Sequence, residues 1–219
     1  MMYQLVIIAT AAIFVGAHHD PSHIHSHDQD PHAAGPLRAV VRLASPDGHD
    51  VHGNVTFEQL EGKVRVTGQI YGMPAGQYGF HVHASGDLTN GCVSAGAHFN
   101  PDKKDHGHPG DENRHVGDLG NVEFNSDKLS HIDITDSMIA LYGPHNIIGR
   151  ALVLHAMADD FGRTDHPDSK KTGNAGGRVA CGVIGILSPI YGWPGNAASM
   201  YIAATFMTSL MALMTILLQ

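Results

Sequence analysis

The chain has 219 residues and a formal net charge of -8, which suits one domain with appended segments. The acidic balance argues against nucleic acid as a partner, because phosphate binding needs a basic surface, and no phosphate-cradling glycine motif is present. The 26 glycines favour a turn-rich, all-β architecture, and the 18 histidines outnumber the 13 lysines and arginines, which indicates metal binding.

The N-terminal segment begins with an uncharged apolar run from Leu5 to Ala17. The run is too short to cross a bilayer comfortably and ends in small residues, so we interpret residues 1–17 as a secretory signal peptide. A buried N-terminal strand is the alternative, but a very polar segment follows at once. Residues 18–36 are rich in histidine and cannot build a core, so we expect them to be disordered. This segment either binds copper or zinc loosely or is a solvated spacer.

Residues 37–187 alternate repeatedly between apolar and polar side chains with the period of a β-strand. The expected strands are Leu37–Ala44, Val51–Leu60, Lys63–Tyr71, Gln77–Ala84, Gly117–Asn125, Leu129–Thr135, Arg150–Ala156 and Arg178–Leu187. Eight strands separated by glycine and proline predict an antiparallel Greek-key sandwich or barrel. Two connections, 85–116 and 157–177, are long, and long loops in compact domains are usually functional.

The C-terminal segment, 188–219, contains a nearly continuous apolar run from Met200 to Leu218. Its length is about that needed to cross a bilayer. Small residues at 196–199 precede it, which is typical of a signal for a glycolipid anchor. A transmembrane anchor is the competing interpretation, and a buried core helix is the least favoured. Either anchor would hold the domain outside the cell, on its surface.

Export would also change the meaning of two other sequence features. Asn54-Val55-Thr56 is the only N-glycosylation sequon, and it matters only in a secreted protein. The two cysteines, Cys92 and Cys181, are expected to form a disulfide in a secreted protein and to remain buried thiols in the cytosol.

The candidate metal ligands begin with His81 and His83, at alternate positions of one expected strand. A period of two places both imidazoles on the same face of that strand. Further donors lie on or beside the first long loop, and His155 lies at a strand end. These further donors are His98, His106, His115 and Asp118. Neutral imidazole suits copper and zinc, and a carboxylate among histidines suits zinc.

Taken together, these residues lie in motifs that resemble the copper/zinc superoxide dismutase family, over roughly residues 38–187. The motifs are Gly79-Phe80-His81-Val82-His83, Gly91-Cys92, Ser94-Ala95-Gly96-Ala97-His98-Phe99-Asn100-Pro101, Arg114-His115-Val116-Gly117-Asp118-Leu119-Gly120-Asn121, Ile147-Ile148-Gly149-Arg150, and the run from Thr172 to Gly185. The resemblance implies a β-sandwich fold and the conversion of superoxide to dioxygen and hydrogen peroxide by copper redox cycling, with a structural zinc.

The resemblance also implies a role for each matching residue. Copper would be held by His81, His83, His98 and His155. Zinc would be held by His98, His106, His115 and Asp118, so that His98 bridges the two metals and takes part in catalysis. Further implied features are an Asp159 that orients histidines of both sites, a Cys92–Cys181 disulfide and a catalytic Arg178 beside copper. Arg178 would attract the superoxide anion, and Lys170 and Lys171 either assist it or are an ordinary solvated pair.

Two departures from the family pattern leave questions open. His108 follows His106 by two residues and competes with it as the zinc ligand, although the alignment favours His106. Ser85 replaces a larger residue near the usual dimer contact, so the implied homodimer is less secure, while Ile148, Gly149 and Ile186 still fit it. Three rival functions are a non-catalytic relative that docks a partner, a copper-only dismutase, and an extracellular metal buffer. The complete ligand set disfavours the first two, whereas the buffer could coexist with catalysis.

Overall fold

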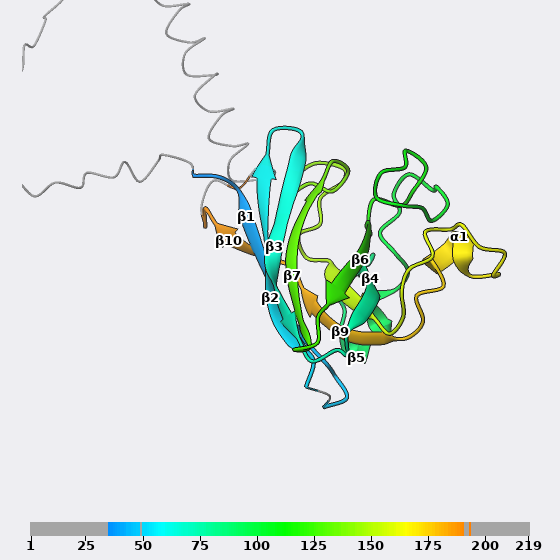
Figure 1. Cartoon of the computed structure of the whole chain (residues 1–219). Coiled ribbons are helices and arrows are strands. Elements are labelled where there is room, and N and C mark those ends of the chain that lie inside the picture. The colour runs from blue at the N-terminus through cyan, green and yellow to red at the C-terminus, as the bar shows by residue number, and fades with distance from the viewer. Residues whose placement is uncertain (1–34, 49, 191–192, 194–219) are drawn as a thin grey trace, which may run out of the picture. The chain divides into compact units, whose positions relative to one another are not determined.

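The computed structural model of the chain describes residues 35–48, 50–190 and 193, and its folded part is built almost entirely of β-strands (Figure 1). The expected signal peptide and the apolar run after Met200 lie outside the described residues, as does nearly all of the histidine-rich segment. Among the residues that are described, none forms a helix long and apolar enough to cross a membrane.

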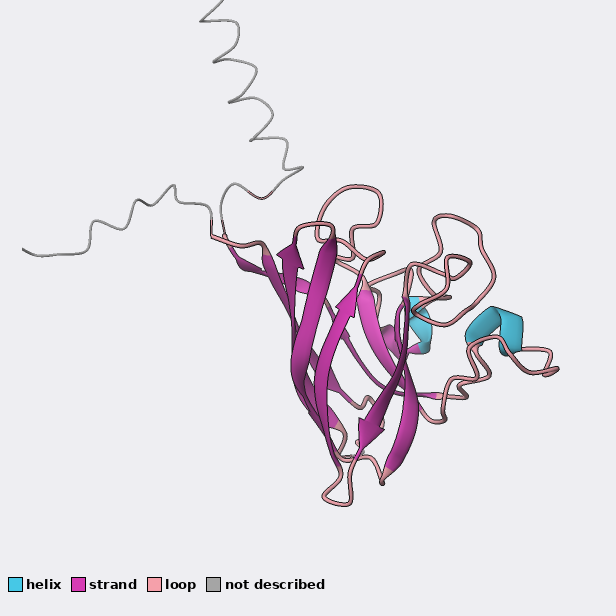
Figure 2. Ribbon diagram, turned by 45° about the horizontal axis from the view of Figure 1, so that its top comes forward, coloured by secondary structure: helices cyan, strands magenta, loops and turns pink. Residues whose placement is uncertain are grey.

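Ten strands follow one another along the described part of the chain. They are β1 (Arg38–Ala44), β2 (His52–Leu60), β3 (Lys63–Tyr71), β4 (Gly76–Val82), β5 (Thr89–Cys92), β6 (Asp118–Phe124), β7 (Leu129–Asp136), β8 (Ala151–His155), β9 (Arg178–Val183) and β10 (Gly185–Ser188). A 3₁₀ turn, η1 (Val93–Ala95), and one short helix, α1 (Ser169–Thr172), lie in the two long loops. Figure 2 shows both helical pieces outside the curved wall of strands.

The main sheet is antiparallel, with the strand order β6-β4-β8-β9-β1-β2-β3-β7. The outermost strands, β6 and β7, follow each other in the chain and are joined by a short turn, so the sheet curves into a nearly closed eight-stranded barrel (Figure 2). Links from β3 to β4 and from β7 to β8 cross between non-adjacent strands, as in a Greek key. The predicted all-β Greek-key barrel is therefore confirmed.

Alternation along the strands builds the core of this barrel. In β1, Ala39, Val41 and Leu43 are buried, whereas Arg42 and Ala44 between and beyond them are exposed. The same period in β2 and β3 buries Val55, Phe57 and other apolar side chains inside the barrel. Burial of this apolar surface is the main force that holds the strands in register.

The expected and observed ends of most strands differ by no more than about two residues, and the structure departs further at two places. The last expected strand divides around Ile184, because β9 pairs mainly with β8 while β10 pairs with β1. The additional strand β5 was not predicted, since its four residues lie inside the first long loop and show no apolar alternation. Both long loops leave the barrel on the side of β4 and β6 (Figure 1), and β4 and β8 carry candidate ligands.

Candidate metal centre

Two strands and one loop bring four histidines to one buried point on the barrel wall. His81 lies in β4, His83 directly follows it, His155 ends β8, and His98 comes from the first long loop. One ring nitrogen from each of the four lies within 4.8 Å of the others. All four side chains are buried.

Hydrogen bonds determine which nitrogen of these rings carries a proton. Three rings face acceptors, and the pairs are His81 Nε2 with Asp159 Oδ2 at 2.8 Å, His83 Nδ1 with the Gly96 carbonyl at 2.8 Å, and His155 Nδ1 with the Gly176 carbonyl at 3.3 Å. A nitrogen that faces a carboxylate or carbonyl oxygen donates its proton to it. The lone pairs therefore remain on His81 Nδ1, His83 Nε2 and His155 Nε2.

A second group of donors surrounds Asp118, at the start of β6. Asp118 Oδ1 lies 2.9 Å from His98 Nδ1, 3.0 Å from His106 Nδ1 and 3.1 Å from His115 Nδ1. These four ligand atoms also lie within 4.8 Å of one another, and all four residues are buried. His98 belongs to both groups, with its Nδ1 in this one and its Nε2 in the first.

Asp159, in the second long loop, connects the two groups. Its Oδ2 accepts from His81 and its Oδ1 accepts from His106 Nε2, each at 2.8 Å. Asn121 in β6 holds the main chain of Asp159 through two hydrogen bonds, of 2.9 Å to its carbonyl and 2.7 Å from its amide. The Asp159 carboxylate thus orients one ring in each group, and the Asn121 side chain fixes the main chain that carries this carboxylate.

The titration behaviour of these groups suits metal ligands. Burial lowers the pKa of His155 to about 4 and also lowers the pKa of His81, His83 and His98, so these rings are neutral imidazoles at pH 7. Burial lowers the pKa of His106 too, but hydrogen bonds with Asp118 and Asp159 outweigh it and raise that pKa to about 9.

The carboxylates themselves stay ionised in this buried setting. Burial alone would raise the pKa of Asp118, but hydrogen bonds with His106, His115 and His98 hold it well below its usual range. The ionised Asp118 carboxylate therefore stabilises a positive charge within the second group, and a bound metal cation would supply that charge.

Unpartnered buried atoms give an independent test of whether metals fit. Among the described side chains, His81 Nδ1 and His98 Nε2 are buried without a hydrogen bond. His83 Nε2 and His155 Nε2 lie 3.3 Å apart and face each other as two lone pairs. Buried polar atoms normally have partners, and a cation supplies the missing partner for all of them. Copper and zinc both accept such imidazole donors.

Arg178, at the start of β9, lies against the first long loop. Its guanidinium donates to the carbonyls of Cys92 at 2.7 Å and Val93 at 3.1 Å, and also to that of Gly96. The Gly96 carbonyl accepts from His83 as well, which links Arg178 to a candidate copper ligand. The predicted Cys92–Cys181 disulfide is present, with 5.7 Å between the two Cα atoms, and it holds this loop against β9.

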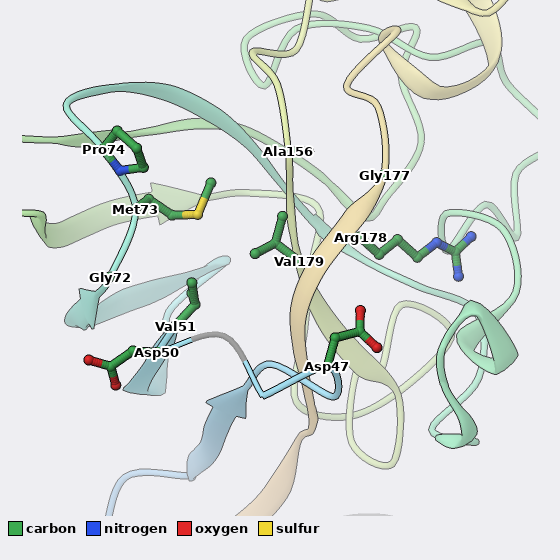
Figure 3. A pocket seen from close by; sticks show the side chains of 10 residues that line it. All are labelled: Asp47, Asp50, Val51, Gly72, Met73, Pro74, Ala156, Gly177, Arg178 and Val179. Carbon is green, nitrogen blue, oxygen red and sulfur yellow. The ribbon is translucent and has the colours of Figure 1, made fainter.

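A cavity of about 410 Å³ beside Arg178 faces away from its charged group. Figure 3 shows the guanidinium pointing away from Met73 and Pro74, while the carboxylates of Asp47 and Asp50 border the cavity. Negative charges at its rim make this cavity unsuited to an anion. The guanidinium instead lies against the first long loop, where the Gly96 carbonyl accepts from both Arg178 and His83.

His108, the alternative to His106, lies outside both groups of donors. Its ring packs edge-on against Phe161, with 4.7 Å between ring centres, and its Nδ1 accepts from the amide of Gly110. Arg163 lies over the same Phe161 ring and pairs with Asp111 at 3.3 Å. The geometry thus favours His106, and His108 joins the two long loops.

Comparison with known proteins gives this centre its context. Residues 51–184 match the family model described as copper/zinc superoxide dismutase (SODC). The chain belongs to the copper/zinc superoxide dismutase family. Its activity is accordingly that of an oxidoreductase that converts superoxide to dioxygen and hydrogen peroxide, with copper and zinc as cofactors.

Individual proteins are similar to this chain over most of their length. The extracellular superoxide dismutase [Cu-Zn] of Drosophila melanogaster is 54% identical over 156 residues, which cover 69% of this chain and 86% of that protein. The superoxide dismutase [Cu-Zn] 5 of Dictyostelium discoideum is 57% identical over 141 residues, or 64% of this chain and 93% of that protein. A crystal structure titled as the clock protein EA4 is 63% identical with a TM-score of 0.67, covering 69% of this chain and 96% of that one.

Sequence reasoning assigned no role to three residues that organise this dismutase centre. Arg114, fully buried, donates to the carbonyls of His115, Val116 and Asp118 and pairs with Asp136 of β7. Asn121 holds Asp159, as described above. Gly173 has a φ of +65°, and a Cβ there would collide with Asp159 Oδ1 and His106 Nε2. All three lie in quoted motifs, but only the folded structure reveals their partners.

Proposed function

We propose that the chain dismutates superoxide at a copper held by His81 Nδ1 and the Nε2 atoms of His83, His98 and His155. The convergence of four lone pairs on one buried point is the observation that carries this assignment. Zinc is assigned to the group around Asp118, whose members are His98 Nδ1, His106 Nδ1, His115 Nδ1 and Asp118 Oδ1.

The bound metals supply the redox change and a fixed charge, because copper cycles between two oxidation states while zinc does not. The residues of the chain supply orientation and protons. His98 Nε2 has no protein partner, so it can hold one of the two protons that the peroxide product requires. Arg178 donates three of its five N–H groups to carbonyls, which leaves two to bind and orient a superoxide anion.

Replacement of one ligand tests the copper assignment. His81→Ala removes one of four donors and the ring that connects copper to Asp159, so we expect loss of copper and of superoxide consumption. His131→Ala is the matched control, because that ring is exposed on β7 and belongs to neither group. Full copper content with wild-type turnover in His81→Ala would show that the assignment is wrong.

Metal analysis of the same preparations separates the rival functions. One copper and one zinc per chain with fast superoxide consumption supports the dismutase. Copper alone would indicate a copper-only enzyme, and folded protein with neither activity nor copper would indicate a non-catalytic docking module.

We further infer an exported protein with residues 1–17 as signal peptide, 18–36 as a histidine-rich disordered segment, 37–187 as the catalytic domain and 188–219 as linker and apolar tail. The extracellular name of the Drosophila relative and the disulfide both support export. Sequencing the N-terminus of protein recovered from culture medium tests it, since retention of residues 1–17 would contradict this organisation.

A homodimer and a glycan belong to the same proposal. The exposed apolar side chains of Val183 and Ile186 support a dimer contact, and light scattering of the purified domain measures its mass.

Asn54 is exposed on the outer face of β2, which supports glycosylation. A mass decrease on treatment with an N-glycosidase, absent in Asn54→Gln, is the expected result.

Attachment to the outer cell surface through the C-terminal tail completes the proposal. The apolar run from Met200 to Leu218 supports it, with either a lipid or a transmembrane anchor. Flotation of the full-length chain with lipid vesicles is the test, and truncation after residue 195 should abolish flotation. Release by a phospholipase that cleaves glycolipid anchors distinguishes the two anchor types.

A further inference from the structure

The segment after β10 is fixed to the barrel by Trp193, the single tryptophan of the chain. Its indole is only 3% exposed and packs in the main hydrophobic core. The indole Nε1 donates to the Leu141 carbonyl at 3.1 Å. Trp193 lies beyond residue 184, where the match to the family ends, so the shared enzyme fold does not account for this contact.

Strand pairing places Trp193 at one end of the barrel. The Leu141 amide donates to Gln59 Oε1 at 2.8 Å, and the Gln59 amide donates to the Leu37 carbonyl at 2.9 Å. Ser188, the last residue of β10, pairs with Arg38 at the start of β1. We name the end of the barrel formed by Leu37, Gln59, Leu141, Ser188 and Trp193 the tail end.

Arg178 lies toward the opposite end. At the far end of β1, Ala44 pairs with Cys181, and Arg178 is three residues further along β9 in the direction away from the tail end. The seven residues of β1 span about 20 Å at ~3.3 Å per residue. Figure 1 shows β10 beside the start of β1, with the β1–β2 connection at the other end of these strands.

Large apolar side chains are exposed around the tail end. Ile190 is 71% exposed and Tyr142 is 47% exposed, and both lie within three residues of the contact between Trp193 and Leu141. Glu61 in the β2–β3 turn and Lys63 at the start of β3 place one exposed charge of each sign at this end. An exposed apolar patch with balanced charge suits an uncharged apolar partner.

The length of chain after Trp193 limits what that partner is. Only residues 194–199 separate it from the apolar run that begins at Met200. An extended chain advances at most ~3.6 Å per residue, so seven steps reach no further than about 25 Å. The small residues at 196–199, where a lipid anchor would be attached, are closer still. Either anchor keeps the membrane within reach of the tail end.

We propose that the tail end of the barrel is a membrane-docking surface, on which Tyr142 and Ile190 enter the lipid interface while the Arg178 side faces the solution. This inference rests on the proposed membrane attachment and adds an orientation to it. Tyrosine and apolar side chains favour the interface between water and lipid. The orientation leaves Arg178, which lies toward the opposite end of the barrel, on the side that faces the solution from which superoxide arrives.

Site-specific labelling of the full-length holoenzyme in phosphatidylcholine vesicles tests this orientation. Ile190→Cys places a thiol at the tail end, and Asp50→Cys, on the 97% exposed carboxylate of the β1–β2 connection, is the matched control at the other end. We expect vesicles to slow labelling of the first thiol by a water-soluble maleimide several-fold relative to detergent. Labelling of the second thiol should remain unchanged. A spin-labelled lipid should quench a dye only at position 190.

The outcomes separate the orientation from the anchor. A chain that does not float with vesicles overturns the anchor and the docking together. A chain that floats but labels equally at both positions keeps the anchor and overturns the docking. Trp193 fluorescence checks the attachment itself, because a buried indole resists quenching by acrylamide. Strong quenching in the folded holoenzyme would show that the tail is not fixed to the barrel, which also overturns the proposal.

Discussion

Asp159 illustrates how much of this centre depends on groups that need not touch a metal. Its two oxygens accept from His81 Nε2 and His106 Nε2, and these bonds leave the lone pair of each ring on Nδ1. An outer carboxylate therefore selects the tautomer of one ring in each proposed site. The ligands are visible in the sequence as a pattern of histidines, whereas this selection depends on contacts 78 and 53 residues apart.

Asp159→Asn should weaken both sites together. An amide presents one acceptor and one donor, so one of the two histidines would face an N–H group and lose its correct tautomer. Retention of copper and zinc against a competing chelator should fall by about 10- to 100-fold. Asp165→Asn, an exposed change in the same loop, should leave retention unchanged. Equal retention in both variants would contradict the role of Asp159.

Gly173→Ala should damage the same arrangement without removing any polar group. The new Cβ would occupy space beside Asp159 Oδ1 and His106 Nε2, at a φ of +65° that also disfavours alanine. We expect zinc to be lost first, because His106 is displaced, and spectra of a cobalt-substituted zinc site would report it. Gly177→Ala is the control, since a Cβ there meets nothing within 4 Å. Equivalent cobalt spectra for the two variants would count against this account.

Secondary-structure elements differ in how far the sequence predicts them. The strands of the barrel wall follow from alternation, and the range expected for β3, Lys63–Tyr71, is the observed one. β5 and α1 could not be predicted, because four-residue elements inside polar loops have no periodicity to read. The loops are positioned by tertiary contacts instead, such as those of Arg114 and of the ring pair His108–Phe161.

Arg114 connects the first long loop to β7, and the cost of breaking this connection can be measured. Asp136→Ala would leave the Arg114 guanidinium buried and unpaired, which should lower the free energy of unfolding by about 3–5 kcal/mol. Asp133→Ala, on the same strand, removes an exposed pair with Arg65 and should have little effect. Urea denaturation of both variants provides the comparison, and similar losses would show that burial does not matter here.

At the scale of the whole molecule, net charge and local charge oppose each other. A chain with a net charge of -8 repels superoxide at long range, whereas Arg178 is a fixed positive charge beside the proposed copper site. Salt screens charges over about 10 Å at 0.1 M, so the salt dependence of the rate reports which contribution dominates. Focusing by a local charge can raise association rates by about tenfold or more, a principle for which superoxide dismutase is itself a worked case.

We expect the value of kcat/KM for the wild-type enzyme to fall as salt is added, because attraction by Arg178 is screened. Arg178→Gln should lower kcat/KM at low salt by about tenfold and flatten or reverse the slope, since only the repelling net charge remains. Arg42→Gln makes the same change in net charge at an exposed position of β1 and should keep the wild-type slope. Arg178→Lys should also keep the slope, because it retains the charge while losing the forked hydrogen bonds to the loop. An unchanged slope in Arg178→Gln would mean that the approach of superoxide is governed by charges elsewhere.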